Sequence, residues 1–269
     1  MILVVSDLHC GSTVGLCPPD YATFDGAVYG LNRIQQWIWA NWQAMQDEWL
    51  PSIVGSDPFA LVVNGDATEG IHHKTVQVVH ADPGVHAKIA IHCLEPLAAR
   101  ASQTFMVRGT EAHVGHTTEA NIGARLNAVK HPESGEHSAF AWNIRVNGTL
   151  CSFKHHIGTS SRLALYATQL SVTLAEEQTA AARHGHEVPT VVVRSHRHTY
   201  GMYTDGHGMV ITTPAWQTLT SFGHKVVPAA VPSVGAVLLD FRSTMNGLPM
   251  VHSFICTVDP AKEFVCGNA

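Results

Sequence analysis

Five apolar runs of the sequence each end in residues that could bind a metal ion. The first run, Ile2–Val5, is followed by Asp7 and His9, which are two residues apart and can point to the same side of a strand end. The same kind of ending recurs four more times along the chain. The polar residues at the five ends are Asp7, His9, Asp66, Glu111, His113, His155, His156, His196 and His198. Carboxylates and imidazoles without cysteine suit Mn, Fe or Zn, so the pattern predicts a metal centre of that kind.

Apolar runs and amphipathic segments alternate along the chain and define the elements that would position these residues. Buried strands are predicted over residues 2–5, 59–64, 104–108 and 189–193. Helices are predicted over about 31–49, 86–100, 118–130 and 159–183. We expect Pro51 to end the first helix and Thr117 to cap the third. Because open α/β sheets place ligands at the carboxyl ends of their strands, the polar endings should meet at one edge.

A β-hairpin is predicted in the middle of the chain. The Asn147-Gly148 pair lies between two strand-like runs, 140–146 and 149–153, and such a pair is a strong hairpin signal. The remainder of the chain predicts further antiparallel strands. No repeat, low-complexity tract or linker interrupts the sequence, so we predict a single domain over residues 1–269.

Composition and charge narrow the class of protein. The 45% hydrophobic content is typical of a globular chain, and no apolar run is long enough to cross a membrane. The first strand begins at Met1 and leaves no room for a cleavable signal, so we expect a cytoplasmic protein with six reduced cysteines and no membrane partner. A net charge of −5 argues against a broad basic surface for nucleic acid. The 19 histidines, which outnumber the 16 lysines and arginines, agree with metal binding.

The order of the polar motifs resembles that of the calcineurin-like metallophosphoesterase family, whose pattern is D-x-H, G-D, G-N-H-[DE], a histidine after a strand, and G-H-x-H. The matching segments here are Asp7-Leu8-His9, Gly65-Asp66, Gly109-Thr110-Glu111-Ala112-His113, His155-His156 and Ser195-His196-Arg197-His198. Two positions depart from the pattern. Thr110 stands in place of the metal-binding asparagine, and Ser195 stands in place of a glycine.

The resemblance implies an α/β fold, a four-layer α-β-β-α sandwich of two mixed sheets flanked by helices, with the metal site at strand carboxyl ends. It also implies two divalent metal ions (Mn, Fe or Zn). Asp7, His9 and His198 would bind one ion, His196 and one histidine of the 155–156 pair the other, and Asp66 would bridge both. A metal-bridging hydroxide would attack a phosphodiester or phosphomonoester, with nucleic acid and nucleotides among the substrates considered.

The altered G-N-H motif leaves two interpretations open. In the first, Glu111 replaces the asparagine as a metal ligand and His113 is the general acid. In the second, Glu111 caps the following helix and His113 is a loop residue. For the histidine pair, strand alternation would put His155 and His156 on opposite faces, so we expect only one of them to be a ligand.

Basic residues near the strand ends are the predicted contacts of the substrate. They are Arg108, His72, Lys74, Arg197 and Lys154. Phosphoryl transfer depends mainly on positioning and charge neutralisation, which such residues provide. The alternative to a phosphoesterase is a catalytically silent metal-binding interaction module, and a weaker one is a metal-dependent hydrolase of C–N or C–O bonds. The sequence makes no prediction of oligomeric state.

Overall fold

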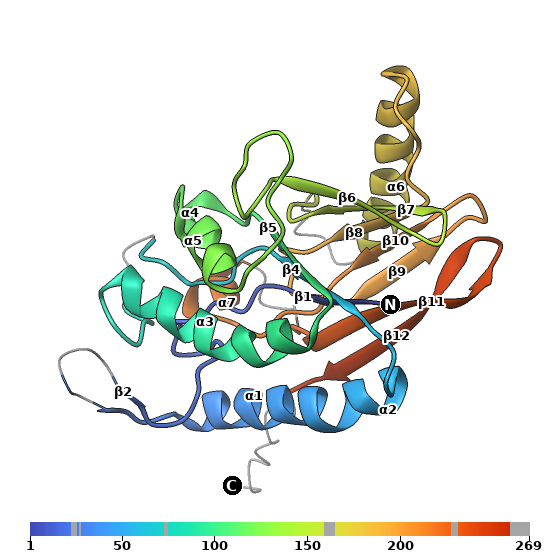
Figure 1. The fold of residues 1–269 in the computed structure, drawn as a ribbon. Coiled ribbons are helices and arrows are strands. Elements are labelled where there is room, and N and C mark those ends of the chain that lie inside the picture. The colour runs from blue at the N-terminus through green and yellow to red at the C-terminus, as the bar shows by residue number, and fades with distance from the viewer. Residues whose placement is uncertain (23–25, 27, 73–74, 159–164, 227–230, 259–269) are drawn as a thin grey trace, which may run out of the picture.

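Two five-stranded sheets form the centre of the molecule (Figure 1). The structure is a computed structural model and describes residues 1–258 except 23–25, 27, 73–74, 159–164 and 227–230. The first sheet has the order β12-β11-β1-β4-β5, and the second has the order β6-β7-β8-β10-β9. Both contain parallel and antiparallel pairs, so both are mixed as predicted.

The strands of the two sheets come from both halves of the chain. The first sheet contains β1 (Ile2–Val5), β4 (Ala60–Asn64), β5 (Gln103–Val107), β11 (Val234–Met245) and β12 (Leu248–Cys256). The second contains β6 (Ala141–Val146), β7 (Thr149–Lys154), β8 (Val191–Arg194), β9 (Gly201–Thr204) and β10 (Met209–Thr212). A separate short pair is formed by β2 (Tyr21–Ala22) and β3 (Val28–Tyr29).

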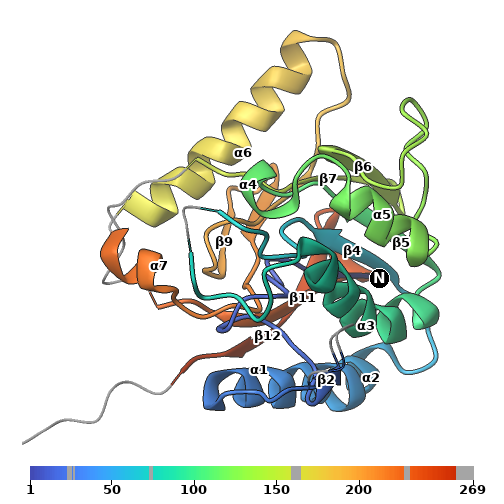
Figure 2. The ribbon, with the colours of Figure 1, turned by 90° about the vertical axis from the view of Figure 1, so that its left-hand side faces the viewer.

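The helices lie outside the sheets, with α6 at the top of Figure 2 and α1 at the bottom. They are α1 (Arg33–Ala44), α2 (Leu50–Val54), α3 (Pro83–Arg100), α4 (Glu111–Val114), α5 (Thr118–Arg125), α6 (Tyr166–Arg183) and α7 (Ser221–Val226). A π-helical segment, Met45–Trp49, joins α1 to α2. No helix among the described residues is both long and apolar enough for a membrane span.

Three apolar clusters separate four layers. Leu3 and Val5 of β1 point toward α1 and α3, in a cluster that includes Trp42. The alternate residues of the same strand, Ile2 and Val4, belong to a second cluster between the sheets. A third cluster joins the far face of the second sheet to α6. The predicted α-β-β-α sandwich is therefore confirmed by the packing.

The predicted helices are found with different ends. The first continues past Pro51, which occupies the opening turn of α2, where its missing N–H is not needed, so the prediction that Pro51 ends the helix was wrong. The helix predicted over 118–130 ends at Arg125, and Asn127 follows with a left-handed φ of 52°. Thr117 makes no capping hydrogen bond, so that prediction was also wrong. Residues 159–164 of the last helix lie outside the described residues.

The predicted hairpin and the predicted sheet edge are both present. Asn147 and Gly148 have φ values of 48° and 84° and join β6 to β7. Strands β1, β4 and β5 run parallel to one another, as do β7 and β8, so the carboxyl ends within each set lie side by side. Ser195 N donates to His155 O at 2.8 Å, which ties together the segments that follow β7 and β8.

Candidate metal centre

The segments after β1 and β8 bring together a first group of ligand atoms, here called the inner cluster: Asp7, His9 and His198. His198 Nε2 lies 3.3 Å from Asp7 Oδ1 and 3.2 Å from His9 Nε2. Asp7 and His9 are buried, and His198 is partly buried. Burial favours the neutral acid, but positive charge on His155 and His198 outweighs it and lowers the pKa of Asp7 to about 2.

A second group, the outer cluster, contains His155, His156 and His196. These imidazoles follow β7 and β8 in the second sheet. Their ring centroids lie 4.9 to 5.2 Å apart. His155 is buried, whereas His156 is exposed and His196 is intermediate. The outer cluster is therefore the more open of the two.

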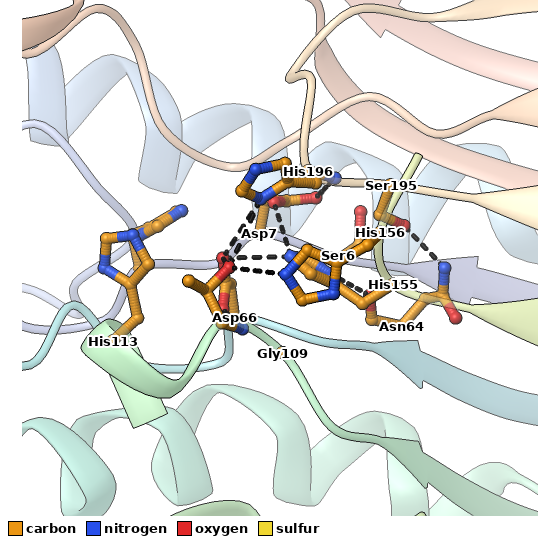
Figure 3. Close-up of polar contacts among 12 residues, drawn as sticks. Ser6, Asp7, Asn64, Asp66, Gly109, His113, His155, His156, Ser195 and His196 are labelled. Carbon is orange, nitrogen blue, oxygen red and sulfur yellow. Dashed lines mark hydrogen bonds and ion pairs between the residues drawn. The ribbon is translucent and has the colours of Figure 1, made fainter. Parts of the chain in front are cut away.

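Asp66, which follows β4, lies close to Asp7 of the inner cluster and to His155 of the outer cluster (Figure 3). Its Oδ2 is 3.0 Å from His155 Nε2 and 4.0 Å from His196 Nδ1. The loop that carries it is tied to the inner cluster, because His9 N donates to Asp66 O at 3.0 Å. Burial opposes ionisation, but His155 and His196 hold the pKa of Asp66 well below its usual range. Asp66 thus lies near ligand atoms of both clusters, and Asp7 does so as well, with its Oδ1 3.9 Å from His155 Nε2.

The protonation of His155 tests whether a cation fits here. His155 Nδ1 is 2.7 Å from Asn64 O, and a carbonyl oxygen only accepts, so Nδ1 carries the hydrogen. In the neutral ring, Nε2 then presents a lone pair to the Asp66 carboxylate at 3.0 Å, which is repulsive. A proton relieves this repulsion: burial lowers the pKa of His155, but Asp66 and Asp7 raise it to about 10. A divalent cation would relieve it in the same way, so the donor set fits a metal.

Backbone conformation also marks this edge of the molecule. Non-glycine residues with positive φ are uncommon and cluster at functional sites. Nine are found among the described residues, and five of them are predicted ligands: Asp7, His9, Asp66, His196 and His198, with φ between 44° and 71°. Each comes just after a strand, and the left-handed turn redirects its side chain toward the shared edge.

Glu69 supports the inner cluster, although the sequence pattern did not identify it as part of the site. Its Oε2 lies 2.9 Å from His9 Nδ1 and accepts from Gln217 Nε2 at 2.7 Å. Its Oε1 lies 3.0 Å from His72 Nε2. A carboxylate behind an imidazole fixes the ring so that the other nitrogen, here His9 Nε2, faces the metal. Burial raises the pKa of Glu69, but its hydrogen bonds to His72 and His9 hold it well below its usual range. The signal in the sequence was an acid three residues after Asp66.

Glu119 connects the two loops that meet at Asp66. It is buried on the first turn of α5 and accepts from Gly109 N at 2.7 Å and from Ala67 N at 3.2 Å. Burial, with a contribution from Asp66, raises the pKa of Glu119 to about 7. An acid in the first turn commonly interacts with the N-terminus of its own helix. Instead, Glu119 fixes the spacing between the ends of β4 and β5.

Thr110 points into the centre, whereas Glu111 does not. Thr110 N donates to Asp66 Oδ1 at 2.6 Å, and its hydroxyl is 3.3 Å from His196 Nδ1 and 3.4 Å from His156 Nε2. The side chain of Glu111 is 75% exposed and pairs with the exposed His116 at 3.1 Å. Among the described residues, none of the possible metal groups includes Glu111. The threonine at the asparagine position therefore keeps an oxygen at the outer cluster.

His113, from α4, lies across Asp66 from the outer cluster (Figure 3). Its ring contacts those of His9 and His72, with centroids 4.7 and 4.2 Å away. His113 Nδ1 is 2.9 Å from Glu69 O, so this nitrogen carries the hydrogen and Nε2 carries the lone pair. Burial and the charge of His9 lower the pKa of His113 to about 4. The ring is accordingly neutral at pH 7.

The two adjacent histidines do not separate as strand alternation suggested. Strand β7 ends at Lys154, before the pair, so its alternation does not extend to His155 and His156. Ligand atoms of both histidines lie within 4.8 Å of one another and of His196. Both are thus within reach of one ion.

The side chains that were predicted to contact the substrate and that the structure describes each have a protein partner of their own. Arg108 Nε donates to Ser138 Oγ at 3.0 Å. His72 pairs with Glu69, and the Arg197 guanidinium lies 4.6 Å from the ring centroid of Tyr166. Lys154 Nζ donates to both carboxylate oxygens of a glutamate on α6, at 2.7 and 2.8 Å. The prediction for Lys74 lies outside the described residues.

Comparisons with known proteins give structural likeness only. No family model matches the sequence, and no curated protein matches it. Similar solved structures include an archaeal phosphodiesterase, with 10% identity over 95% of this chain and 99% of that one and a TM-score of 0.45. Vps29 of Entamoeba histolytica in complex with Zn²⁺ has 11% identity over 94% and 98%, with a TM-score of 0.40. A predicted phosphoesterase of Streptococcus pneumoniae has 12% identity over 94% and 97%, with a TM-score of 0.36. Phosphoesterases are thus among the similar structures, as the motifs predicted, but TM-scores this low assign no function.

Proposed function

We propose that this chain is a calcineurin-like metallophosphoesterase that binds two divalent cations, Mn, Fe or Zn, and hydrolyses a phosphoester. One observation carries the proposal. The inner and outer clusters both adjoin the buried carboxylate of Asp66, at the carboxyl ends of strands from both sheets. Repeated carboxylate and imidazole ligands converging in this way are difficult to explain by packing, because buried charges are costly unless they are paired or bind a metal.

The residues have distinct roles in this proposal. Asp7, His9 and His198 would hold one cation, and the three imidazoles of the outer cluster would hold the other. Asp66 would supply a carboxylate to both. Bound divalent cations lower the pKa of water and neutralise charge on phosphoryl oxygens, which is the chemistry that phosphoester hydrolysis needs. Thr110 positions Asp66 through two hydrogen bonds, at 2.6 and 3.1 Å.

His113 is the residue proposed to assist the leaving group. To donate from Nε2 the ring must first gain a proton, and the low pKa opposes this at neutral pH. A series of substrates with different leaving groups tests the role. If His113 is the acid, His113→Ala should reduce the rate for poor leaving groups by roughly 10²–10⁴-fold and for nitrophenolate esters much less. An equal loss across the series would assign the residue to the support of His9 instead.

Hydrolysis of bis-p-nitrophenyl phosphate with Mn²⁺ tests the function as a whole. The expected result is turnover that EDTA abolishes and Mn²⁺ restores, with about two metal ions bound per chain by elemental analysis. Phosphomonoesters and nucleotides in the same panel would define the substrate class. A fully metal-loaded protein that hydrolyses no phosphoester would instead support the silent metal-binding module.

A further inference from the structure

A pocket of about 300 Å³ opens beside the outer cluster. Its lining includes Arg108, Gly109, Glu111, His116, Phe140 and His156. His156 belongs to the outer cluster, and Gly109 directly precedes Thr110, whose backbone N–H donates to Asp66. A group bound in the pocket would therefore lie next to a phosphoryl group held at the metal centre. The volume is at the lower end of the range for ligand pockets and suits one ring system.

Phe140 gives the pocket a flat apolar wall. Its side chain is 72% exposed, which is unusual for a large aromatic residue in a folded chain. The guanidinium of Arg108 lies 5.2 Å from the ring centroid, and Arg108 is itself held by Ser138. This cation–π contact holds the ring at the pocket. An exposed, positioned aromatic ring is a surface on which a planar ligand can stack.

The pocket lining also includes polar side chains. Glu111 offers carboxylate oxygens, and His116 offers ring nitrogens; the two side chains are 75% and 85% exposed. They pair with each other at 3.1 Å, and their exposure leaves them accessible to donors and acceptors on a ligand. An aromatic wall together with such groups is the combination that binds nucleobases, through stacking and through hydrogen bonds to the ring edge.

We propose that this pocket binds the nucleobase of a nucleoside phosphoester, stacked on Phe140, while the phosphoryl group lies at the metal centre. The inference rests on the proposed phosphoesterase function and specifies its substrate class. An aliphatic phosphoester would leave the ring of Phe140 unused. A long nucleic acid is a poorer match, because the chain has 21 acidic against 16 basic residues and a pocket with space for one base.

Two esters with the same leaving group test the proposal. Thymidine 5′-(p-nitrophenyl phosphate) and methyl p-nitrophenyl phosphate both release nitrophenolate and differ only in the retained alcohol. The Mn²⁺-loaded protein should have a higher kcat/KM for the thymidine ester. Phe140→Ala should reduce the ratio of the two kcat/KM values by about 10-fold, the effect of losing one stacked base. Phe140→Trp should retain the ratio.

The control is Phe222→Ala, because Phe222 is also an exposed phenylalanine, 54% exposed on α7, and does not line the pocket. It should leave the ratio as in the wild type. A ratio near one in the wild type, or the same ratio after Phe140→Ala, would overturn the nucleobase site while leaving the phosphoesterase intact.

A binding measurement separates failure of this proposal from failure of the proposed function. If neither ester is hydrolysed, thymidine 5′-monophosphate and inorganic phosphate are titrated into the Mn²⁺-loaded protein by calorimetry. Tighter binding of the nucleotide that is lost in Phe140→Ala would support the pocket without catalysis. Equal affinity for the two ligands would overturn it.

Discussion

The inner and outer clusters use similar ligands but differ in how the protein supports them. In the inner cluster, His9 is backed by the buried Glu69, which is held in turn by His72 and Gln217. In the outer cluster, His155 is backed by a backbone carbonyl, and His156 is exposed. The difference indicates that preorganisation is concentrated at one end of the centre. We therefore expect the inner cluster to bind its cation more tightly and the outer one to exchange more readily.

The outer cluster also faces the pocket that we assign to the substrate. His156 lines that pocket, and Thr110 places a hydroxyl where the related motif has an amide. A metal site that must admit a substrate needs open coordination positions, whereas a site that anchors the centre does not. The weaker support of the outer cluster is thus consistent with its position at the entrance. Variants of the two clusters should separate these roles.

The largest effect is expected from Asp66→Asn, which removes the carboxylate shared by the two clusters. Asparagine would offer one neutral oxygen in place of the two oxygens of a charged carboxylate. It therefore could not offset the positive charge of two divalent cations. We expect metal content and phosphoester hydrolysis to fall to near background, measured by elemental analysis and by turnover. His186→Ala, an exposed histidine beyond α6, is the control and should keep both. Unequal loss, with one ion retained in full, would show that Asp66 does not bridge.

A smaller and selective effect is expected from Glu69→Gln. Glutamine keeps one oxygen that can accept from His9, but it loses the negative charge that strengthens this contact, so His9 is held less firmly. The affinity of the tighter site should fall by about 10- to 100-fold while the weaker site changes little. Titration with Zn²⁺ followed by calorimetry would resolve the two sites. Equal weakening of both would mean that Glu69 supports the centre as a whole, and the contrast between the clusters would disappear.

Most of the residues predicted as ligands lie close together in the structure, because each follows a strand end. Asp7, Asp66 and His196 follow apolar runs directly, and parallel strands necessarily bring such ends together. Glu69 and Glu119 were missed as partners because their contacts depend on how loops fold back across the edge. Glu119 looked like an ordinary helix-opening acid, but its oxygens accept from the two neighbouring loops.

The histidine pair and the altered motif could not be placed from spacing alone. Alternation gives the direction of a side chain only while the strand continues, and β7 ends before His155. Similarly, α4 begins at Glu111 and turns its side chain to the surface, which spacing along the sequence does not reveal. The fold was predicted more completely than the site, because the strand and helix patterns indicated an α/β chain and the family resemblance implied the four-layer sandwich.

Within the outer cluster, His155→Ala should weaken metal binding at least about tenfold more than His156→Ala. His155 is buried, and its Nδ1–H is fixed by Asn64 O, so its Nε2 is held toward Asp66. His156 is exposed and has no comparable fixed partner behind its ring among the contacts found for the described residues. Calorimetric titration of both variants with Mn²⁺ gives the comparison. Similar losses would indicate that both imidazoles contribute equally to one site.

The smallest effect is expected from a change far from both clusters, at the Asp240–Arg242 pair in β11. This change tests whether the difference between the inner and outer clusters depends only on their own surroundings. Arg242 Nη2 lies 2.7 Å from Asp240 Oδ2, and this pairing lowers the pKa of Asp240 to about 2, from 3.8. Because the folded-state pKa is lowered, the stabilisation is present above pH 3.8 and is lost as the pH falls toward 2. Arg242→Gln should therefore reduce the free energy of unfolding near neutral pH and have less effect in acid.

The reduction should be small, because the Arg242 side chain is exposed and solvent screens the pair. The reduction in the free energy of unfolding can be measured by urea unfolding of the wild type and of Arg242→Gln at a series of pH values. Both proteins lose metal in acid, and this common effect cancels when the difference between them is taken at each pH. Metal affinity at the two clusters should be the same in both proteins. A changed affinity would mean that packing of the first sheet controls the centre at a distance, and the difference between the clusters could then no longer be attributed to their own hydrogen bonds.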